Sequence, residues 1–330
     1  MRKTAVDKHL YLKIAAISVL VIFLLVAGFL LLKKWEEKKG TFPSHEFGDT
    51  SIMYNGTEYL LKDSVETFLV MGLDKFEGTH SMDSYNNDMQ ADFLMLLVFD
   101  NETRQTSAIH INRDTMADVN VLGVAGNKVD TLTKQIALAH TYGNGKDVSC
   151  RNTADAVSSL LNGIRINHYI SLKMDSVSVI NDLVGGVEVV VLDDFSGVDD
   201  ALIKGETVTL MGEHALTYVR TRKDLEDSSN SSRMKRQQQY INALYDKVRL
   251  CAEANEGFVV EASLKVSDYI VSDRSVTQLQ TLFNKFNEYE FLGIRNIEGE
   301  SKLGEQFVEF YPNSDSIQKN VIELFYAPKK

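Results

Sequence analysis

Residues 67–73 read TFLVMGL, residues 93–99 read FLMLLVF and residues 107–111 read SAIHI. Each run is short, mostly apolar and bounded by polar residues, which is typical of a buried β-strand. Residues 187–192 and 216–219 have the same character and are predicted as further strands. These five runs predict the sheet around which the chain folds.

Helical patterns alternate with these runs along the chain. Apolar residues three or four apart predict helices at 132–142, 153–161, 174–183, 232–254, 276–286 and 316–325. Gly185-Gly186 is expected to end the third helix, and Ser314 or Asp315 is expected to cap the last one. The alternation, without internal repeats, indicates a single α/β domain with a mixed sheet over residues 61–330.

An uncharged stretch precedes this domain. Residues 14–32 read IAAISVLVIFLLVAGFLLL, 19 residues without a charge, and a helix of this length crosses the hydrocarbon layer of a membrane. Large apolar residues at its end suit signal-peptide cleavage badly. The sequence therefore predicts a short tail at 1–13, an uncleaved transmembrane anchor at 14–32 and a tether at 33–60.

The charge flanking the anchor does not decide its orientation. Four Lys or Arg residues precede the anchor and four follow it closely, so the positive-inside rule gives a tie. The N-terminal amine slightly favours a cytoplasmic N-terminus, with the domain outside the cell membrane. The opposite topology, with the domain acting as a cytoplasmic regulator, stays open at this point.

Charge is distributed unevenly. The chain has a net charge of −11, but residues 1–42 carry eight Lys or Arg and three Asp or Glu, so the remainder carries −16. General nucleic-acid binding depends on a basic face, so this class of protein is excluded. Cys150 and Cys251 lie in no metal-binding spacing, and both a disulfide between them and two separate thiols are compatible with the sequence.

The residues that could carry chemistry are Arg and Asp at strand ends. The sequence contains no HExxH, GxSxG, Walker or GxGxxG motif. Asp74 follows the first predicted strand, Asp92 opens the second, and Arg113 and Asp114 follow the third. Arg220 and Arg222 follow the strand predicted at 216–219, and their spacing of two would project both side chains to one side.

The helix predicted at 232–254 adds further polar groups. Arg233 and Gln237 are four residues apart and share one helix face, and Arg236 lies beside that face. Several converging guanidinium groups would bind phosphate oxygens, and carboxylates beside them could hold Mg²⁺. Such a site would stabilise charge in phosphoryl transfer. The alternative is a set of surface salt bridges, which are common and contribute little.

Six motifs in this order resemble the LytR-CpsA-Psr family: FLVMGLD, ADFLMLLVF, INRDT, NDLVGGVEV, LTYVRTRKD and RMKRQQQ, over about residues 66–250. The resemblance implies a membrane-anchored protein facing the outside, with a mixed sheet flanked by helices and an apolar cleft for a lipid chain. It also implies a phosphotransferase, which attaches a polyprenyl-pyrophosphate-linked glycopolymer of the teichoic acid or capsule type to peptidoglycan through a phosphodiester.

The resemblance also implies roles for residues. Arg113, Arg220 and Arg222 would stabilise charge on the phosphates, and Asp92 is the candidate general base. The substrate-binding residues would be Arg233, Arg236, Gln237 and Gln90, and Asp74 and Asp92 would hold Mg²⁺ or Mn²⁺. Most of these assignments rest on matching positions in the motifs. Gln90 and Arg236 are included because they lie beside matched residues, and Asp92 is proposed as base from its place in the predicted site.

Two positions depart from the family pattern. The chain has Gln90-Ala91-Asp92 where the family commonly has Arg-Ser-Asp, and Asn230 where an Asp commonly precedes the helix arginine. The loop between residues 75 and 89 is also longer than expected. These departures motivate an alternative: a non-catalytic envelope assembly factor that binds polyprenyl pyrophosphate.

Overall fold

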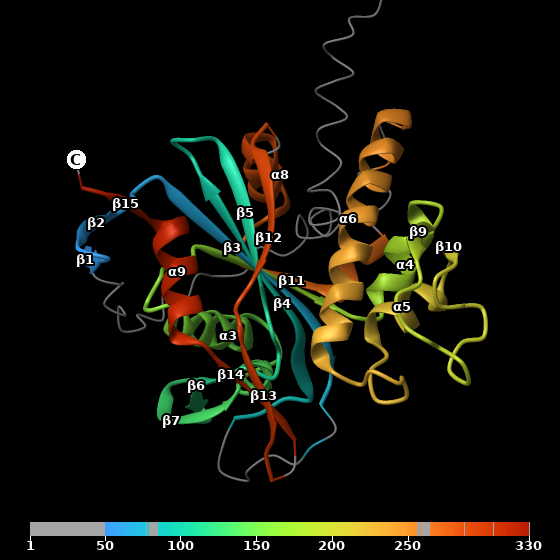
Figure 1. Ribbon diagram of the computed structural model, residues 1–330, viewed down its shortest axis with the longest axis horizontal. Coiled ribbons are helices and arrows are strands. Elements are labelled where there is room, and N and C mark those ends of the chain that lie inside the picture. The colour runs from blue at the N-terminus through green and yellow to red at the C-terminus, as the bar shows by residue number, and fades with distance from the viewer. Residues whose placement is uncertain are drawn as a thin grey trace, which may run out of the picture. The chain divides into compact units, whose positions relative to one another are not determined.

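The computed structural model describes residues 50–76, 78, 85–255, 258, 265–286, 288–305 and 307–329. These residues form two compact units. Unit 1 contains residues 173–270 and 274–288, and unit 2 contains the residues up to 172, residues 271–273 and residues from 289 onward. Figure 1 labels the elements of both units, which are described separately below. The predicted tail at 1–13, anchor at 14–32 and first part of the tether lie outside the described residues.

The central sheet of unit 2 confirms the strands predicted at 67–73, 93–99 and 107–111. Its six strands have the order β11-β8-β3-β4-β5-β12, and Figure 1 labels all of them except β8. Their bounds are β3 Val65–Lys75, β4 Met89–Asp100, β5 Gln105–Ile111, β8 His168–Lys173, β11 Ile270–Ser272 and β12 Glu290–Asn296. β4 pairs with β3 and β5 antiparallel, whereas β12 pairs with β5 parallel. The mixed sheet of the α/β prediction is therefore confirmed.

A β-bulge interrupts the β3–β4 ladder next to the candidate site. Leu73 pairs with Ala91 and Gly72 pairs with Phe93, so Asp92 is the extra residue on β4. A bulge re-aims side chains locally and increases the strand twist. The irregularity thus falls on a residue for which the sequence predicts a chemical role.

The tether prediction is wrong for residues 51–60. β1 (Ser51–Tyr54) and β2 (Thr57–Leu61) form an antiparallel hairpin. Asn55 and Gly56 have φ angles of 49° and 78°, as required in a two-residue turn whose twist matches the flanking strands. The Asn-Gly pair between two short segments that contain Ile52, Met53, Tyr54, Tyr59 and Leu60 is a strong hairpin signal.

The helix predicted at 132–142 is also wrong. β6 (Met116–Leu122) pairs with β7 (Lys128–Gln135), and a 3₁₀ helix, η2 (Ile136–Thr141), follows. β7 contains Thr131 and Thr133, whose β-branched side chains favour strand geometry. The following helix, α3 (Asp147–Leu160), agrees with the prediction at 153–161.

The C-terminal segment completes unit 2. β13 (Gly299–Leu303) and β14 (Val308–Pro312) form a two-stranded ribbon, α9 (Ser314–Phe325) follows, and β15 (Tyr326–Pro328) pairs with β2. The cap of α9 is Asn313 rather than Ser314 or Asp315, because its side chain accepts bonds from the backbone N–H groups of Asp315 and Ser316. Residues from 289 onward therefore belong to the fold of the sheet.

Unit 1 is built from helices and one hairpin. Its elements are α4 (Ser176–Leu183), β9 (Val187–Val190), β10 (Thr207–Leu210), α5 (Glu213–Arg220), α6 (Asn230–Ala254), η3 (Ser267–Tyr269) and α8 (Val276–Phe286). α4, β9, α6 and α8 agree with the predictions for those segments, and Gly185 and Gly186 end α4 with φ angles of 75° and 87°. The predicted boundary of one domain at 61–330 stays a prediction.

The strand predicted at 216–219 is wrong, because this segment is part of helix α5. Ala215, Leu216, Tyr218 and Val219 are buried, and this spacing places them on one helix face. The run of four residues at 216–219 is too short to distinguish this helical spacing from a strand. Gly212, with a φ of 49°, precedes the helix.

The core of unit 2 contains two buried groups with strongly shifted pKa values. Burial lowers the pKa of His140 to about 4, although Nδ1 of its ring lies 3.0 Å from the carbonyl oxygen of Met89. Burial also raises the pKa of the Cys150 thiol to about 12. Cys150 and Cys251 are both free thiols in this structure, so they form two separate thiols and not a disulfide.

No helix within the described ranges is long and apolar enough to cross a membrane. The predicted anchor at 14–32 lies outside those ranges. The apolar lipid cleft implied by the family resemblance stays a prediction.

Candidate functional site

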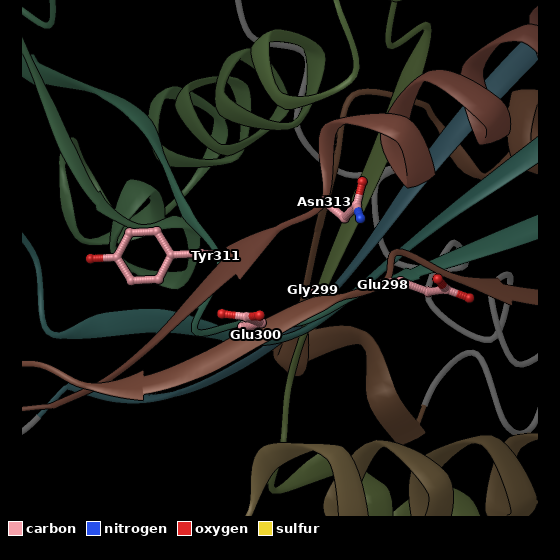
Figure 2. Close-up of a pocket in the computed structure, with 5 residues that line it drawn as sticks. All are labelled: Glu298, Gly299, Glu300, Tyr311 and Asn313. Carbon is pink, nitrogen blue, oxygen red and sulfur yellow. The ribbon is translucent and has the colours of Figure 1, made fainter.

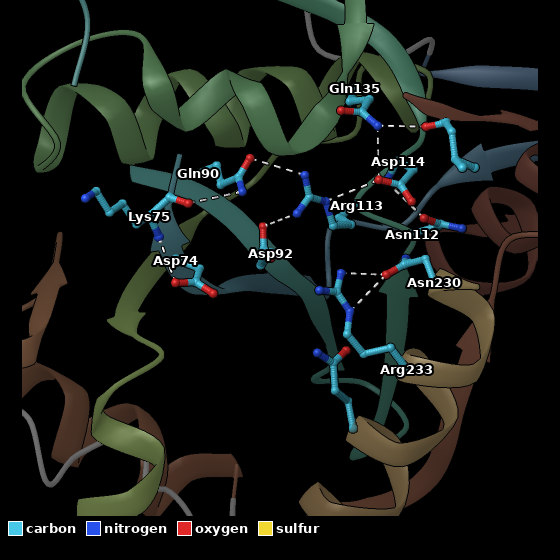
Figure 3. Close-up of polar contacts among 12 residues, drawn as sticks. Asp74, Lys75, Gln90, Asp92, Asn112, Arg113, Asp114, Gln135, Asn230 and Arg233 are labelled. Carbon is cyan, nitrogen blue, oxygen red and sulfur yellow. Dashed lines mark hydrogen bonds and ion pairs between the residues drawn. The ribbon is translucent and has the colours of Figure 1, made fainter. Parts of the chain in front are cut away.

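Arg113 is the centre of a polar cluster in unit 2. It follows β5, and its guanidinium forms a short ion pair with the carboxylate of Asp92 and donates from Nη2 to Oε1 of Gln90 at 3.2 Å. Gln90 and Asp92 lie two residues apart on β4, so the same strand supplies both partners. Figure 3 shows Arg113 between these residues and Asp114. The structure thus brings together three predicted site residues, and we call Gln90, Asp92, Arg113 and Asp114 the Arg113 cluster.

The charged side chains of the cluster are largely shielded from solvent. The side chain of Arg113 is 11 % exposed, that of Asp92 8 % and that of Asp114 1 %. Arg113 Nε lies 3.2 Å from Oδ1 of Asp114 as an ion pair, without the alignment of a hydrogen bond. Charges in such an environment interact more strongly than in water. The guanidinium is therefore oriented on several sides by acceptors before any ligand arrives.

Two residues outside the prediction support the cluster. Gln135 donates from Nε2 to Oδ1 of Asp114 at 3.1 Å, and Oδ1 of Asn112 accepts from the backbone N–H of Asp114 at 2.9 Å. The first contact orients a carboxylate that is almost fully buried, and the second fixes the backbone of the same residue. The sequence pattern predicts a helix over this segment, so Gln135 does not stand out. In the structure it is the last residue of strand β7, the kind of position at which the other candidate residues were found.

Asp74 lies on the strand next to the Arg113 cluster. It pairs in register with Gln90, and Oδ1 of its carboxylate accepts from the backbone N–H of Lys75 at 2.8 Å. Asp74 and Asp92 supply oxygen donors of the kind that Mg²⁺ prefers, and one or two carboxylates are enough when phosphate completes the coordination. No group of three or more His, Cys, Asp or Glu residues within the described ranges could hold a metal ion by itself. The two carboxylates therefore fit a Mg²⁺ ion whose coordination is completed by the oxygens of a bound phosphate.

Arg220 and Arg222 lie at the C-terminal end of α5 in unit 1. Arg220 is the last residue of the helix and is exposed, and Arg222 lies two residues beyond it and is half-buried. The argument that both side chains project to one side assumed a strand before them, whereas the preceding segment is a helix that ends at Arg220. Cations at a helix C-terminus are favourable beside the unpaired carbonyl groups there.

Arg236 is fully buried, which corrects its prediction as a substrate-binding residue. Nη1 donates to the carbonyl oxygen of Tyr218 at 2.6 Å and Nη2 to that of Thr221 at 2.5 Å. Nε lies 2.9 Å from Oδ2 of Asp193. The guanidinium carbon also lies 5.2 Å from the centre of the Phe195 ring. Burial lowers the pKa of Arg236, and the Asp193 carboxylate opposes this effect.

Gln237 is buried too and contacts the same helix end. Its Nε2 donates to the carbonyl oxygen of Val219 at 3.1 Å. The last carbonyl groups of a helix have no partner within it, and those of Tyr218 and Val219 in α5 are satisfied from α6. We call Arg236 and Gln237 the α5 clamp, since they position the helix end that carries Arg220 and Arg222. The predicted direct contact of Gln237 with phosphates stays a prediction.

Arg233 lies one turn earlier on α6 and is 4 % exposed. Its Nε and Nη2 both donate to Oδ1 of Asn230, at 3.0 and 2.5 Å. An amide oxygen orients the guanidinium without cancelling its charge. Asn230 therefore keeps the geometry of a carboxylate partner while leaving the positive charge in place.

The predicted site residues thus fall into two sets. Unit 2 holds Asp74, Gln90, Asp92 and Arg113, and unit 1 holds Arg220, Arg222, Arg233, Arg236 and Gln237. Each set is coherent by itself. Their convergence on one ligand stays a prediction.

Comparison with known proteins identifies a family. Residues 36–323 match the model of the LytR_cpsA_psr family. The chain is 28 % identical over 254 residues to the polyisoprenyl-teichoic acid–peptidoglycan teichoic acid transferase TagV of Bacillus subtilis strain 168, and the match covers 72 % of this chain and 61 % of TagV. It is 27 % identical over 269 residues to the transferase TagU of Enterococcus faecalis, covering 80 % of this chain and 79 % of TagU. The chain therefore spans less than two thirds of the first of these relatives.

Solved structures share the fold. The crystal structure of B. subtilis TagV has a TM-score of 0.57 and 24 % identity, covering 80 % of this chain and 97 % of that one. A structure of TagT bound to LIIa-WTA has a TM-score of 0.58 and 21 % identity, covering 79 % and 90 %. At these identities the likeness concerns the fold alone.

Proposed function

The chain belongs to the LytR_cpsA_psr family, and on this premise we propose that it is a phosphotransferase of cell-wall assembly. It attaches a glycopolymer carried on polyprenyl pyrophosphate to peptidoglycan and leaves a phosphodiester link. The names of TagV and TagU as teichoic acid transferases support this activity. The type of glycopolymer, teichoic acid or capsule, is part of the proposal.

The geometry of Arg113 is the observation that carries the proposal. Its guanidinium is oriented by Asp92, Gln90 and Asp114 and retains partial exposure of 11 %. A pre-oriented, partly dehydrated cation stabilises charge that develops on phosphate oxygens. Arg220, Arg222 and Arg233 supply further guanidinium groups in unit 1, and the α5 clamp holds the first two in place.

The proposed step forms one bond and breaks one. A sugar hydroxyl of peptidoglycan attacks the phosphorus nearest the glycan, so a new O–P bond forms. The bond from that phosphorus to the bridging oxygen breaks, and polyprenyl phosphate leaves with the electron pair. Asp92 accepts the proton of the attacking hydroxyl group. Its ion pair with Arg113 holds the carboxylate in position for this transfer.

A divalent ion fits this step. Asp74 and Asp92 would hold Mg²⁺ or Mn²⁺ together with phosphate oxygens, and the ion would neutralise charge on the leaving phosphate. The predicted anchor at 14–32 would place the protein in the cell membrane with its N-terminus in the cytoplasm and both units outside, where the carrier lipid and peptidoglycan meet.

The test compares two arginines of unit 2. Full-length protein in detergent, with Mg²⁺, a polyprenyl-pyrophosphate-linked oligosaccharide and a peptidoglycan fragment, is assayed for release of polyprenyl phosphate. Arg113→Ala is expected to fold and lose transfer. Arg151→Ala, which breaks an exposed pair with Asp147, is expected to transfer normally. Normal transfer by a folded Arg113→Ala protein would contradict the proposal.

The neutral residues Gln90 and Asn230 favour a second candidate function, that of a carrier-binding assembly factor without turnover. Each provides an amide oxygen to an arginine where the family commonly has a charged residue. Such a protein would bind polyprenyl pyrophosphate, release no polyprenyl phosphate, and gain turnover in the double variant Gln90→Arg and Asn230→Asp. Turnover by the unchanged protein would exclude this alternative.

A further inference from the structure

The ribbon of β13 and β14 carries a pocket at its base. The pocket has a volume of about 350 Å³ and is lined by Glu298, Gly299, Glu300, Tyr311 and Asn313. Figure 2 shows these residues on the two strands and at their ends. All five lie outside the six sequence motifs and outside the Arg113 cluster.

Neighbouring side chains hold the ring of Tyr311 at this pocket. Tyr311 is 43 % exposed and lies directly opposite Glu300 in the ribbon. Its hydroxyl donates to Oε2 of Glu309 at 2.5 Å, and Nζ of Lys302 lies 5.4 Å from the ring centre. Lys302 in turn lies 3.3 Å from Oε2 of Glu300. The ring is therefore an exposed but oriented aromatic surface.

The backbone around the pocket is closely packed. A Cβ atom on Gly299 would lie 2.3 Å from the carbonyl oxygen of Tyr311, so no larger residue fits there. The N–H of Asn313 donates to the carbonyl oxygen of Glu298 at 2.8 Å, and the Asn313 side chain caps α9. The pocket thus sits on a fixed junction between the ribbon and a helix.

The chemistry of the lining indicates which ligand it suits. Ionised carboxylates only accept hydrogen bonds, so Glu298 and Glu300 match a ligand rich in hydroxyl donors and disfavour phosphate. An aromatic ring offers an apolar face together with specific geometry. A sugar ring combines hydroxyl groups at its edge with an apolar C–H face. We propose that this pocket binds an uncharged hexosamine ring.

The ribbon is tied to the segment that follows Arg113. The N–H of Phe310 donates to the carbonyl oxygen of Asp114 at 2.8 Å, and Phe310 forms a parallel bridge with Thr115. Gln135 links both parts, because its Nε2 contacts Oδ1 of Asp114 and the carbonyl oxygen of Val308 at 2.7 Å. The pocket and the Arg113 cluster therefore belong to one hydrogen-bonded network in unit 2.

The source of the sugar follows from charge, and this step rests on the proposed function. The donor glycan arrives attached to pyrophosphate, which the carboxylates of the pocket disfavour. The acceptor glycan of peptidoglycan presents hexosamine rings without phosphate. The pocket is thus an acceptor subsite that holds one ring of the peptidoglycan strand.

The test measures binding of an N-acetylglucosamine tetramer to the full-length protein in detergent by calorimetry. Tyr311→Ala is expected to weaken binding about tenfold, which corresponds to 1.4 kcal/mol, and Glu300→Gln about threefold. Tyr245→Ala removes a tyrosine that is 42 % exposed on α6 and is the matched control, with unchanged binding. N-acetylglucosamine 1-phosphate is expected to bind more weakly than N-acetylglucosamine itself.

The outcomes separate this inference from the proposed function. Equal tetramer binding by all variants, or no binding at all, overturns the pocket assignment even if transfer proceeds. Preferred binding of the phosphorylated sugar overturns the acceptor assignment. Tetramer binding that depends on Tyr311 and is unchanged in Arg113→Ala supports the subsite, and it would stand even if no transfer were detected.

Discussion

Arg113 in unit 2 and Arg236 in unit 1 are each paired with an aspartate, but their surroundings differ. Arg113 is 11 % exposed and its partners come mainly from side chains on one strand. Arg236 is fully buried, and two of its N–H groups bind backbone carbonyls at the end of α5. The difference teaches that arginines in family motifs can be held in unlike ways: Arg113 by side chains at a strand end, Arg236 by the backbone of a helix end.

The largest expected loss of stability comes from removing Arg236, the fully buried arginine. Arg236→Met leaves Asp193 without its cation and the carbonyls of Tyr218 and Thr221 without donors. Breaking a buried ion pair in this way costs about 3–5 kcal/mol. Chemical denaturation monitored by circular dichroism measures this loss. If Arg236→Met were as stable as the unchanged protein, the clamp would not hold α5.

We expect acid to reduce the free energy of unfolding of unit 2 by an amount similar to the loss in Arg236→Met. The pKa of His140 is about 4 in the folded protein, against 6.5 for an ordinary histidine. Between these pH values the unfolded chain binds more protons, so stability falls as pH decreases from about 6.5 to about 4. The expected loss at pH 4 is about 3 kcal/mol.

Denaturant titrations at pH 7 and pH 4.5 test this expectation. His140→Gln should flatten the pH profile whatever its stability at pH 7. A steep profile that persists in His140→Gln would assign the acid sensitivity to other groups.

Arg113→Ala sharpens the comparison from the opposite side. Loss of a charge-stabilising donor lowers turnover by roughly 10²–10³-fold. Arg113→Ala also removes the cation beside the carboxylates of Asp92 and Asp114. Unlike Arg236→Met, it takes no donor from a backbone carbonyl, so we expect a smaller fall in melting temperature. Steady-state transfer and thermal melts on the same samples provide the measurement. Equal destabilisation by the two variants would erase the distinction between them.

The smallest effect is expected at Asn230. Asn230→Asp keeps an acceptor for Nε and Nη2 of Arg233 but adds a negative charge beside the guanidinium. Affinity for inorganic pyrophosphate should fall roughly three- to tenfold, or about 1 kcal/mol, as measured by calorimetry. Asp227→Asn, at an exposed position shortly before α6, serves as the control. Tighter binding by Asn230→Asp would mean that Arg233 does not contact the anion.

The sequence predicts the centre of the fold better than its edges. The apolar runs of β3, β4 and β5 are bounded by polar residues and indicate buried strands. α6 is 25 residues long, which suits a helix and not a strand. α5 was misread because four apolar residues alone do not distinguish a strand from a helix. β7 lies in a segment for which the sequence predicts a helix, because the strand is mostly exposed and its apolar residues alternate only weakly.

The candidate site follows the same rule. Gln90, Asp92 and Arg113 lie at the ends of recognised strands, so their proximity could be predicted from the sequence. The burial of Arg236 could not, because it depends on carbonyl groups of α5 and on Asp193 and Phe195, which are distant along the chain. The role of Gln135 was lost with the misread strand.

The small sheet of β1, β2 and β15 determines how mechanical force enters unit 2. β1 pairs only with β2, and β2 is held on its other side by β15, with Lys329 bound to Glu58. A pull on the chain before Ser51 loads the β1–β2 hairpin from its open end, so its bonds break one after another rather than together. β1 would therefore extend first, as a short compliant spring, while β2 and the central sheet keep their register. The Arg113 cluster, which is built on β4 and on the residues after β5, would keep its geometry while β1 extends.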